Sequence, residues 1–332
     1  MMRWQSICVV GGAGFIGSNL CLTLAEQGAR LRVVDDFSTG KRANLAPIAE
    51  RPHVEILEGD ITEPAVCEAA VRDMQLVLDL ACLGVRHSIR HPARNFQVNG
   101  NGTLNLLLAA RDGGVERFVY VSSSEVYGTA MRTPMDEDHP TYPMTVYGAG
   151  KLAGEATTRA FQRTYGFPTM VIRPFNTYGP NSHHEGDSGE VIPRFIVRVM
   201  NGLAPVIFGD PTNARDFTYV TDTVQGILAA AECDALVGET VNIAYGQPRT
   251  VAEVAAAVLK AAGRTDLEPV QERPRPGDVH LHYADTTKAQ KMIGWCPMIA
   301  LEQGIARLLE HLNRTGVDFR KMLSEQSTFN WE

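Results

Sequence analysis

The sequence predicts an α/β protein built on a doubly wound parallel sheet, with a smaller, discontinuous C-terminal lobe. Three observations support this prediction. In the first half of the chain, short β-branched runs alternate with longer helical patterns, which is typical of a parallel sheet with right-handed crossovers. These runs are apolar without interruption, as strands buried on both faces should be. The first run leads directly into a glycine-rich turn and then a helix.

The elements alternate in a regular order along the chain. We expect strands at residues 6–10, 31–35, 54–58, 76–80, 117–122, 169–173 and 240–244. We expect helices at residues 14–27, 101–112, 147–165, 192–201 and 220–232. Proline, glycine and asparagine are frequent in 174–216, and 248–332 is mostly helical in pattern. We therefore assign residues 1–173 and 217–247 to the sheet domain. The remaining segments, 174–216 and 248–332, form a lobe over the carboxyl edge of the sheet.

Composition narrows the class of protein. The chain has 332 residues, of which 44% are hydrophobic, and a net charge of -7, which argues against a nucleic-acid partner. No apolar run is long enough to span a membrane, and the N-terminus lacks the pattern of a signal peptide. The six cysteines include no C-x-x-C pair, as expected of reduced thiols. We therefore expect a cytoplasmic protein that contacts neither nucleic acid nor membrane.

A dinucleotide site is predicted at the first turn. Gly11, Gly14 and Gly17 follow the first strand in the pattern G-x-x-G-x-x-G. The first permits a tight turn, the second lets the backbone approach a pyrophosphate, and the third allows close packing of helix on strand. Phe15 and Ile16 begin the helix, whose N-terminal amides attract phosphate. This is the Rossmann arrangement.

Acidic residues after the second and third strands indicate which dinucleotide binds. Asp35 ends the second strand eighteen residues beyond Gly17, followed by Asp36. A carboxylate there accepts from ribose hydroxyls and repels a 2′-phosphate, so NAD is favoured over NADP. The alternative is that this pair caps a turn. Asp60 and Ile61, after the third strand, lie where an acceptor would meet the adenine amino group, or where Asp60 would cap a helix.

The reactive groups are predicted on the long helix at 147–165. Tyr147 and Lys151 share one helix face at i,i+4 spacing. We expect the ammonium and a positive nicotinamide ring to lower the pKa of Tyr147, so that the phenol takes a proton from a substrate hydroxyl. The serine run that contains Ser123 ends a strand at the edge where ligands bind. Its hydroxyl would bridge the substrate oxygen and Tyr147.

These motifs resemble those of one family. GGAGFIGS, VSSSEVYG, YGAGK, RPFNTYGP, RDFTYV and RPGDV occur in this order over nearly the whole chain. The sequence is similar to extended short-chain dehydrogenases/reductases of the NAD-dependent nucleotide-sugar epimerase/dehydratase family, UDP-glucose 4-epimerase among them. The resemblance implies retained NAD, a nucleotide-diphosphate sugar as substrate with a UDP-sugar favoured, and a homodimer formed through the helices at 101–112 and 147–165.

The resemblance also implies roles for individual residues. Ser123, Tyr147 and Lys151 match the catalytic groups, with Asn99 supporting them at the cofactor. The substrate contacts expected from the same matches are Ser124, Asn176, Val191, Phe208, Arg215, Arg275 and Asp278. Among these, the two arginines would clamp the pyrophosphate, while Val191 and Phe208 would flank the nucleobase.

Glu125 keeps three reactions open. A 4-epimerase needs only Ser123, Tyr147 and Lys151 to oxidise C4 and return the hydride to the other face. A 4,6-dehydratase needs a further acid/base, and members of that kind resemble this sequence at Glu125. A UDP-glucuronate decarboxylase is less favoured, because HLHYADTTKA replaces the basic element expected after RPGDV. A UDP-sugar 4-epimerase acting on a hexose or a uronate is the first expectation. A non-catalytic NAD-binding protein is disfavoured, because both Tyr147 and Lys151 are present.

Several other features carry weaker expectations. Arg86 lies in the loop after the fourth strand, facing the sugar, where it would meet a uronate carboxylate or be solvated. His183 and His184 superficially resemble a metal cluster, but their spacing fits no usual zinc pattern, and no metal is expected. The polar segment from about Thr315 is expected to be peripheral.

Overall fold

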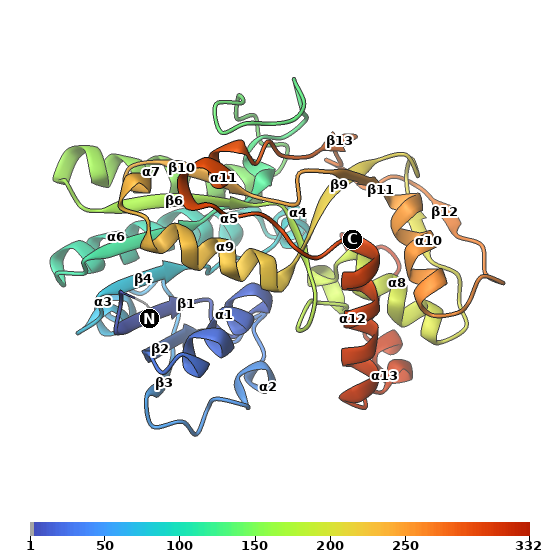
Figure 1. Ribbon diagram of the computed structural model, residues 1–332, viewed down its shortest axis with the longest axis horizontal. Coiled ribbons are helices and arrows are strands. Elements are labelled where there is room, and N and C mark those ends of the chain that lie inside the picture. The colour runs from blue at the N-terminus through green and yellow to red at the C-terminus, as the bar shows by residue number, and fades with distance from the viewer. Residues whose placement is uncertain (1–2) are drawn as a thin grey trace.

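The largest element of the computed structural model, which describes residues 3–332, is a seven-stranded parallel sheet (Figure 1). Its strand order is β10-β6-β5-β4-β1-β2-β3. These strands are β1 (Ser6–Val10), β2 (Arg30–Asp35), β3 (Val54–Glu58), β4 (Leu76–Asp79), β5 (Arg117–Val121), β6 (Thr169–Pro174) and β10 (Thr240–Ile243). The order reverses between β1 and β4, the place where open α/β sheets bind ligands. The predicted doubly wound sheet is confirmed.

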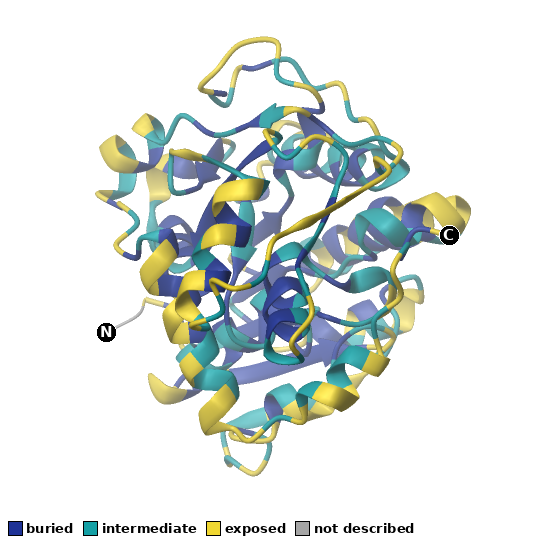
Figure 2. Ribbon diagram, turned by 90° about the vertical axis from the view of Figure 1, so that its right-hand side faces the viewer, coloured by how far each residue is buried: buried dark blue, intermediate teal, exposed yellow. Residues whose placement is uncertain are grey.

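Alternate residues of each strand enter cores on opposite faces of the sheet. Ile7 and Val9 of β1 join one core, and Cys8 and Val10 join the other. The helices on the first face include α1 (Phe15–Glu26) and α9 (Val220–Glu232), and those on the second include α3 (Pro64–Val71), α6 (Thr103–Asp112) and α7 (Val146–Tyr165). Figure 2 shows the dark, buried strands inside helices whose outer sides are exposed.

One predicted strand departs from the expected burial. Val54–Glu58 forms β3, but Glu55 and Glu58 are exposed. This strand is the sheet's edge, paired only with β2 in the sheet. The expectation that every strand is buried on both faces is therefore wrong for β3, whereas β10 at the opposite edge is buried along its whole length.

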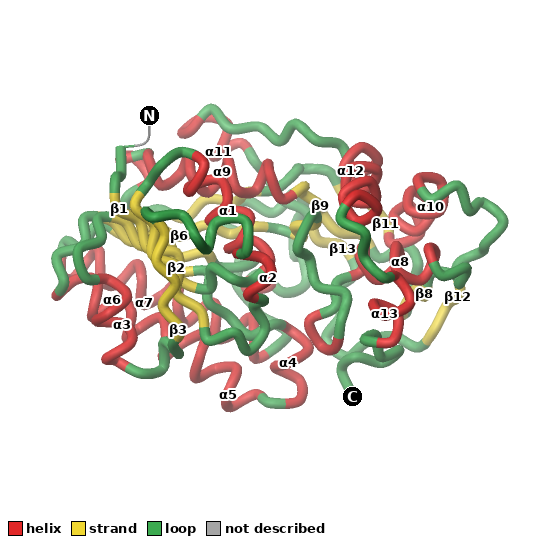
Figure 3. The backbone as a smooth tube through the Cα atoms, turned by 90° about the horizontal axis from the view of Figure 1, so that it is seen from below, coloured by secondary structure: helices red, strands yellow, loops and turns green. Residues whose placement is uncertain are grey.

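The elements outside the seven-stranded sheet and its covering helices form a second group, which lies at the end of the molecule away from that sheet (Figures 1 and 3). Four strands make one small sheet, namely β7 (Asn176–Tyr178), β9 (Ala214–Tyr219), β11 (Pro248–Thr250) and β13 (Leu281–His282). A further pair is β8 (Val206–Phe208) with β12 (Val270–Glu272), and the helices are α8 (Val191–Met200), α10 (Val251–Ala261), α12 (Leu301–Arg314) and α13 (Phe319–Ser324). The expected junction at residue 217 lies inside β9, which pairs only with strands of this group.

The remaining helices are α2 (Arg42–Leu45), α4 (Val85–Arg90), α5 (Pro92–Phe96) and α11 (Thr287–Ile293). A π-helical stretch, Gln97–Gly102, precedes α6, so the helix expected from residue 101 starts at Thr103. Within residues 3–332, no helix is both long enough and apolar enough to cross a lipid bilayer.

Candidate active site

A cavity of about 470 Å³ runs along the carboxyl edge of the main sheet. Its lining comes from the turns after β1, β2, β3, β4, β5 and β6, and from α8, β8, β9 and the segment 275–278 of the second group. Of the residues predicted for the site, Asn99 alone is outside the lining. We call the part around Gly11, Gly17 and Asp35 the cofactor end, and the part around Phe208, Arg215 and Arg275 the nucleotide end.

The glycine turn at the cofactor end is shaped to admit a phosphate group. Gly11 has a φ of +75°, in the left-handed region. A Cβ atom on Gly17 would collide with the carbonyl oxygen of Gly11, so only glycine lets α1 approach the turn this closely. No side chain caps the start of α1 at Gly14, which leaves its first amides free for an anion. Phe15 and Ile16 line the cavity beside it.

Asp35 holds this turn together. Its Oδ2 accepts from the amide of Ala13 at 2.8 Å and its Oδ1 from the amide of Phe37 at 2.9 Å. Burial raises the pKa of Asp35, and these amides oppose the rise. The side chain also lines the cavity, so the structural role and the predicted ribose contact are compatible. Asp36 caps its own turn by accepting from Ser38.

The other two acceptors predicted near the cofactor serve mainly as supports. Asp60 accepts from the amide of Thr62 and forms an ion pair with Arg94, while the buried Ile61 follows it in the cavity wall. Asn99 is fully buried behind the wall, where its side chain bonds both the amide and the carbonyl of Leu83. It therefore fixes a lining loop and has no direct access to the cavity.

Helix α7 presents Tyr147 and Lys151 to the cavity. Thr145 caps the helix by accepting from the amide of Gly148 at 3.2 Å. A Cβ at Gly148 would lie 2.7 Å from the carbonyl oxygen of Glu125, so the small residue brings the helix against the serine run after β5. Lys151 is 1% exposed, and its Nζ donates to the carbonyl of Val121 at 2.9 Å.

The protein environment of Tyr147 favours the neutral phenol. Burial raises its pKa well above the ordinary value, and the hydrogen bond from Ser123 opposes this rise. The Lys151 ammonium donates to the Val121 carbonyl and also lowers the pKa of Asp79, which burial raises to about 6. The predicted joint effect of Lys151 and a bound nicotinamide ring on the pKa of Tyr147 stays a prediction.

Ser124 and Glu125 follow at the floor of the site. The Ser123 hydroxyl accepts from the amide of Glu125 at 3.2 Å, which fixes this turn. Ser124 is buried, and its carbonyl contacts Nε2 of His282 at 3.1 Å. Within residues 3–332 the Glu125 carboxylate makes no ion pair, although it lines the cavity. It is thus available for chemistry.

The nucleotide end carries a surplus of positive charge. Arg215 and Arg275 both bond Oδ1 of Asp278, at 2.6 Å and 2.9 Å, so one carboxylate orients two guanidinium groups. Arg86 also lines the cavity, and burial lowers its pKa, with Arg275 acting in the same direction. A cluster of cations with few acids is suited to a diphosphate.

The lining of the nucleotide end also includes one uncharged polar side chain and two apolar side chains. Asn176 has a buried Oδ1 with no partner among the described residues, an acceptor that a ligand hydroxyl would satisfy. Val191, at the start of α8, and Phe208, at the end of β8, form apolar lining. These placements agree with the predicted sugar and nucleobase contacts, whose roles remain predictions.

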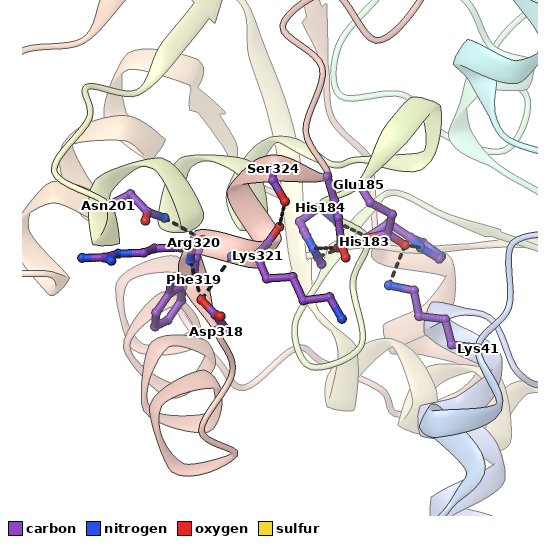
Figure 4. Close-up of polar contacts among 11 residues, drawn as sticks. Lys41, His183, His184, Glu185, Asn201, Asp318, Phe319, Arg320, Lys321 and Ser324 are labelled. Carbon is purple, nitrogen blue, oxygen red and sulfur yellow. Dashed lines mark hydrogen bonds and ion pairs between the residues drawn. The ribbon is translucent and has the colours of Figure 1, made fainter.

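The histidine pair serves as a link between segments. His183 Nδ1 lies 2.9 Å from Glu185 Oε1, and Lys41 contacts the same oxygen at 2.7 Å (Figure 4). His184 Nε2 meets Glu325 at 3.0 Å. Among residues 3–332 no three acidic, histidine or cysteine side chains are grouped so as to hold a metal ion.

The sequence did not predict two features of the cavity. Glu190 has a buried Oε2 with no partner in the part of the chain described, and burial raises its pKa to about 7. A lone glutamate before a helix gives no signal in a single sequence. The expectation that the C-terminal segment is peripheral is wrong, because Asn330 and Trp331 are buried and line the cavity. The two aromatic residues of FNWE were the available signal.

Comparison with known proteins agrees with this geometry. Residues 8–308 match the sequence profile of the family described as GDP-mannose 4,6 dehydratase. A putative UDP-glucose 4-epimerase of Methanocaldococcus jannaschii is 34% identical over 314 residues, which cover 93% of this chain and all of that protein. The Thermotoga maritima UDP-glucose 4-epimerase, solved with UDP-glucose, is 34% identical with a TM-score of 0.87 and covers 93% of this chain and 99% of its own.

A dehydratase is also similar. The dTDP-glucose 4,6-dehydratase of Streptomyces venezuelae, solved with NAD bound, is 29% identical with a TM-score of 0.87, over 93% of this chain and 97% of that one. The glycine turn, with its uncapped amides, fits the same cofactor. The chain therefore belongs to the NAD-dependent nucleotide-sugar epimerase/dehydratase family of short-chain dehydrogenases/reductases and is an enzyme of that family.

Proposed function

We propose that this enzyme is a UDP-sugar 4-epimerase acting on a hexose or a uronate. The observation that carries the proposal is that Ser123, Tyr147 and Lys151 line one cavity with the glycine turn, because epimerisation at C4 needs no further acid or base. The two relatives at 34% identity, both described as UDP-glucose 4-epimerases, support the same choice.

The chemistry divides between cofactor and protein. Bound NAD would supply the hydride acceptor and donor for C4 of the sugar. Tyr147 takes the proton of the C4 hydroxyl as the hydride leaves, and gives it back when the ketone is reduced. The Ser123 hydroxyl bonds the same substrate oxygen and so holds it against the phenol. Lys151, fixed by the Val121 carbonyl, orients the cofactor ribose and adds positive charge beside Tyr147.

The substrate's diphosphate and base bind at the nucleotide end in this proposal. Arg215 and Arg275 donate to the diphosphate in a geometry preset by Asp278, which reduces the entropy lost on binding. Val191 and Phe208 contact the uracil ring. Between these groups and Tyr147, the sugar turns over to expose its other face to the cofactor.

The second candidate is an NDP-sugar 4,6-dehydratase. The observation that favours it is the Glu125 carboxylate, which lines the cavity without an ion pair among the described residues. In a dehydratase this group would remove the C5 proton or protonate the departing C6 hydroxyl, since both steps need an acid/base beyond Tyr147.

Proton NMR in deuterated water separates these reactions. The protein is incubated with NAD and, in separate tubes, UDP-glucose, UDP-glucuronate, UDP-N-acetylglucosamine, GDP-mannose and dTDP-glucose. The proposal predicts a 4-epimer of a UDP-sugar with no deuterium at C5. A 4-keto-6-deoxy product carrying deuterium at C5 would instead establish the dehydratase and assign the acid/base role to Glu125. Release of carbon dioxide with a pentose would contradict both.

We also propose that the enzyme is a homodimer. Several large apolar side chains are exposed on the helices of one side of the molecule, namely Ile89, Phe96, Leu104, Leu108 and Tyr165. They belong to α4, α5, α6 and α7, which include the helices expected to pair. Exposed apolar surface of this kind is typical of an interface. Sedimentation equilibrium tests the proposal, and a monomer at micromolar concentration would contradict it.

A further inference from the structure

The C-terminal residues 325–332, which we call the tail, lie against the nucleotide end of the cavity. The family profile matches residues only up to 308, so the tail is outside the region that defines the family. Nevertheless, Thr328, Asn330 and Trp331 line the cavity. Trp331 is 6% exposed and Asn330 is 1% exposed. Glu325, Ser327, Thr328 and Glu332 are exposed, but the two buried residues make this part of the tail a component of the cavity wall.

Hydrogen bonds attach the tail to the loop before α8. Asn330 Nδ2 donates to the carbonyl of Gly186 at 2.9 Å, and the amide of Gly186 donates to the carbonyl of Glu325 at 3.1 Å. On α8 itself, Arg194 donates to the carbonyl of Ser327 at 2.7 Å. The tail thus holds the segment that leads to Glu190 and Val191, both of which line the cavity.

The same tail is tied to the cofactor end through the histidine pair. Glu325, at the end of α13, contacts His184, and the neighbouring Glu185 contacts Lys41 in the turn after β2. Figure 4 shows α13 and the loop of His183 to Glu185 side by side, with Lys41 reaching the loop from the opposite side. These polar contacts fix the position of the tail relative to both parts of the cavity.

Aromatic contacts place Trp331 beside the expected base contact. Its ring meets that of Phe208 edge-to-face, with centroids 4.9 Å apart. Phe329 packs on Trp331 at 5.5 Å and lies under the guanidinium of Arg273 at 4.3 Å. Arg273 in turn pairs with Glu332. The cluster is largely aromatic, and it is next to arginines suited to a diphosphate, as a nucleobase pocket requires.

We infer that the tail is a substrate-binding element in which Trp331, together with Phe208, forms the wall that packs against the uracil ring of the UDP-sugar. This inference rests on the proposed function for the identity of the base. Stacking of a base on an aromatic side chain is a substantial part of binding free energy. Because the contact is to the base and not to the sugar, it contributes to affinity and leaves the chemical step at Tyr147 unaffected.

The test is calorimetric titration of the NAD-loaded protein with UDP. Trp331→Ala is expected to weaken UDP binding by about tenfold or more, with a smaller loss for Trp331→Phe. The matched control is Trp295→Phe, a buried tryptophan in the sheet core, which should bind UDP as the wild type does. All variants should retain NAD. Unchanged UDP affinity in folded Trp331→Ala overturns the inference.

A second measurement applies if Trp331→Ala does not fold. The chain has three tryptophans, so replacing Trp4 and Trp295 with phenylalanine leaves Trp331 as the sole indole emitter. Saturating UDP should change its fluorescence, and an unchanged spectrum contradicts the inference. UDP binding requires no turnover, so the role of Trp331 in binding UDP and the epimerase activity can be refuted independently of each other. An enzyme that converts no UDP-sugar but loses UDP affinity in Trp331→Ala contradicts only the epimerase.

Discussion

The two ends of the cavity are built by different means. At the cofactor end, one continuous stretch around Gly11 and Gly17 offers main-chain amides, and Asp35 holds that backbone in place. At the nucleotide end, side chains from distant segments meet, as when Arg215 of β9 and Arg275 share Asp278. A site made of backbone depends on the shape of a local turn, whereas a site made of side chains depends on how distant segments pack.

Helix α7, which carries Tyr147, lies between these two ends. Removing the hydroxyl group of Tyr147 should have the largest effect of the changes considered. Tyr147→Phe removes the only hydroxyl proposed to carry the C4 proton, so turnover should fall at least about a hundredfold. NAD content should stay that of the wild type, because the cofactor end is untouched. Steady-state kinetics together with absorbance of the bound nucleotide checks both. Near-wild-type turnover would remove Tyr147 from the mechanism.

Adding a methyl group in the glycine turn should weaken NAD binding at the cofactor end, which is built from main-chain groups. In Gly17→Ala the new Cβ would collide with the Gly11 carbonyl, so the turn must open and NAD retention should fall by roughly tenfold. Gly114→Ala is the control, because a Cβ there would meet no atom within 4 Å, so the variant adds a methyl group and the strain of a φ of +73° away from the cavity. The nucleotide released on denaturing each purified protein measures the effect. Equal NAD content in the two variants would contradict the backbone account.

Removing one arginine should weaken substrate binding at the nucleotide end, which is built from side chains, and leave NAD binding at the cofactor end unchanged. Arg275→Ala deletes a charged donor to the diphosphate, and KM for UDP-glucose should rise by about tenfold. NAD content should not change. Arg249→Ala is the matched control in the same lobe, since Arg249 pairs with Glu302 on the surface and should leave KM unaltered. A fall in kcat with constant KM would place Arg275 in the chemical step instead.

The smallest expected effect is a pH dependence of binding at the nucleotide end. Burial raises the pKa of Glu190 to about 7, opposed by His183 and Arg86. Glu190 is therefore neutral near pH 6 and ionised near pH 8, where it repels the diphosphate. UDP-glucose, whose diphosphate does not titrate in this range, should bind roughly threefold more weakly at pH 8. In Glu190→Gln this dependence should flatten, and an identical pH profile would assign it to another group such as His183.

The same contrast explains what the sequence could predict. The strands, the helix at 220–232 and the glycine turn depend on local pattern, and the structure contains them almost as expected. Nearly every residue that the family motifs predicted for the site lines the cavity. The burial of Trp331 and of the Glu190 Oε2 atom, which has no hydrogen-bond partner among residues 3–332, arises from packing between segments far apart in the chain. No local periodicity records such contacts, so both escaped prediction.

Asn99 and Tyr147 show a second limit. Asn99 was expected at the cofactor, but its amide group is used to hold Leu83. For Tyr147, the i,i+4 spacing correctly placed Lys151 on the same helix face, yet the ammonium bonds the Val121 carbonyl. Spacing along a helix predicts proximity, but the partner of a polar group depends on what the rest of the fold offers.

The most direct test of the central claim follows the hydrogen at C4. UDP-glucose carrying deuterium at C4 is incubated with the NAD-loaded enzyme in ordinary water, and the products are examined by NMR and mass spectrometry. The account predicts UDP-galactose with the deuterium still at C4, because the cofactor keeps the hydride between the two half-reactions. Loss of the label to solvent, or its appearance at C6 of a 4-keto-6-deoxy sugar, would contradict epimerisation.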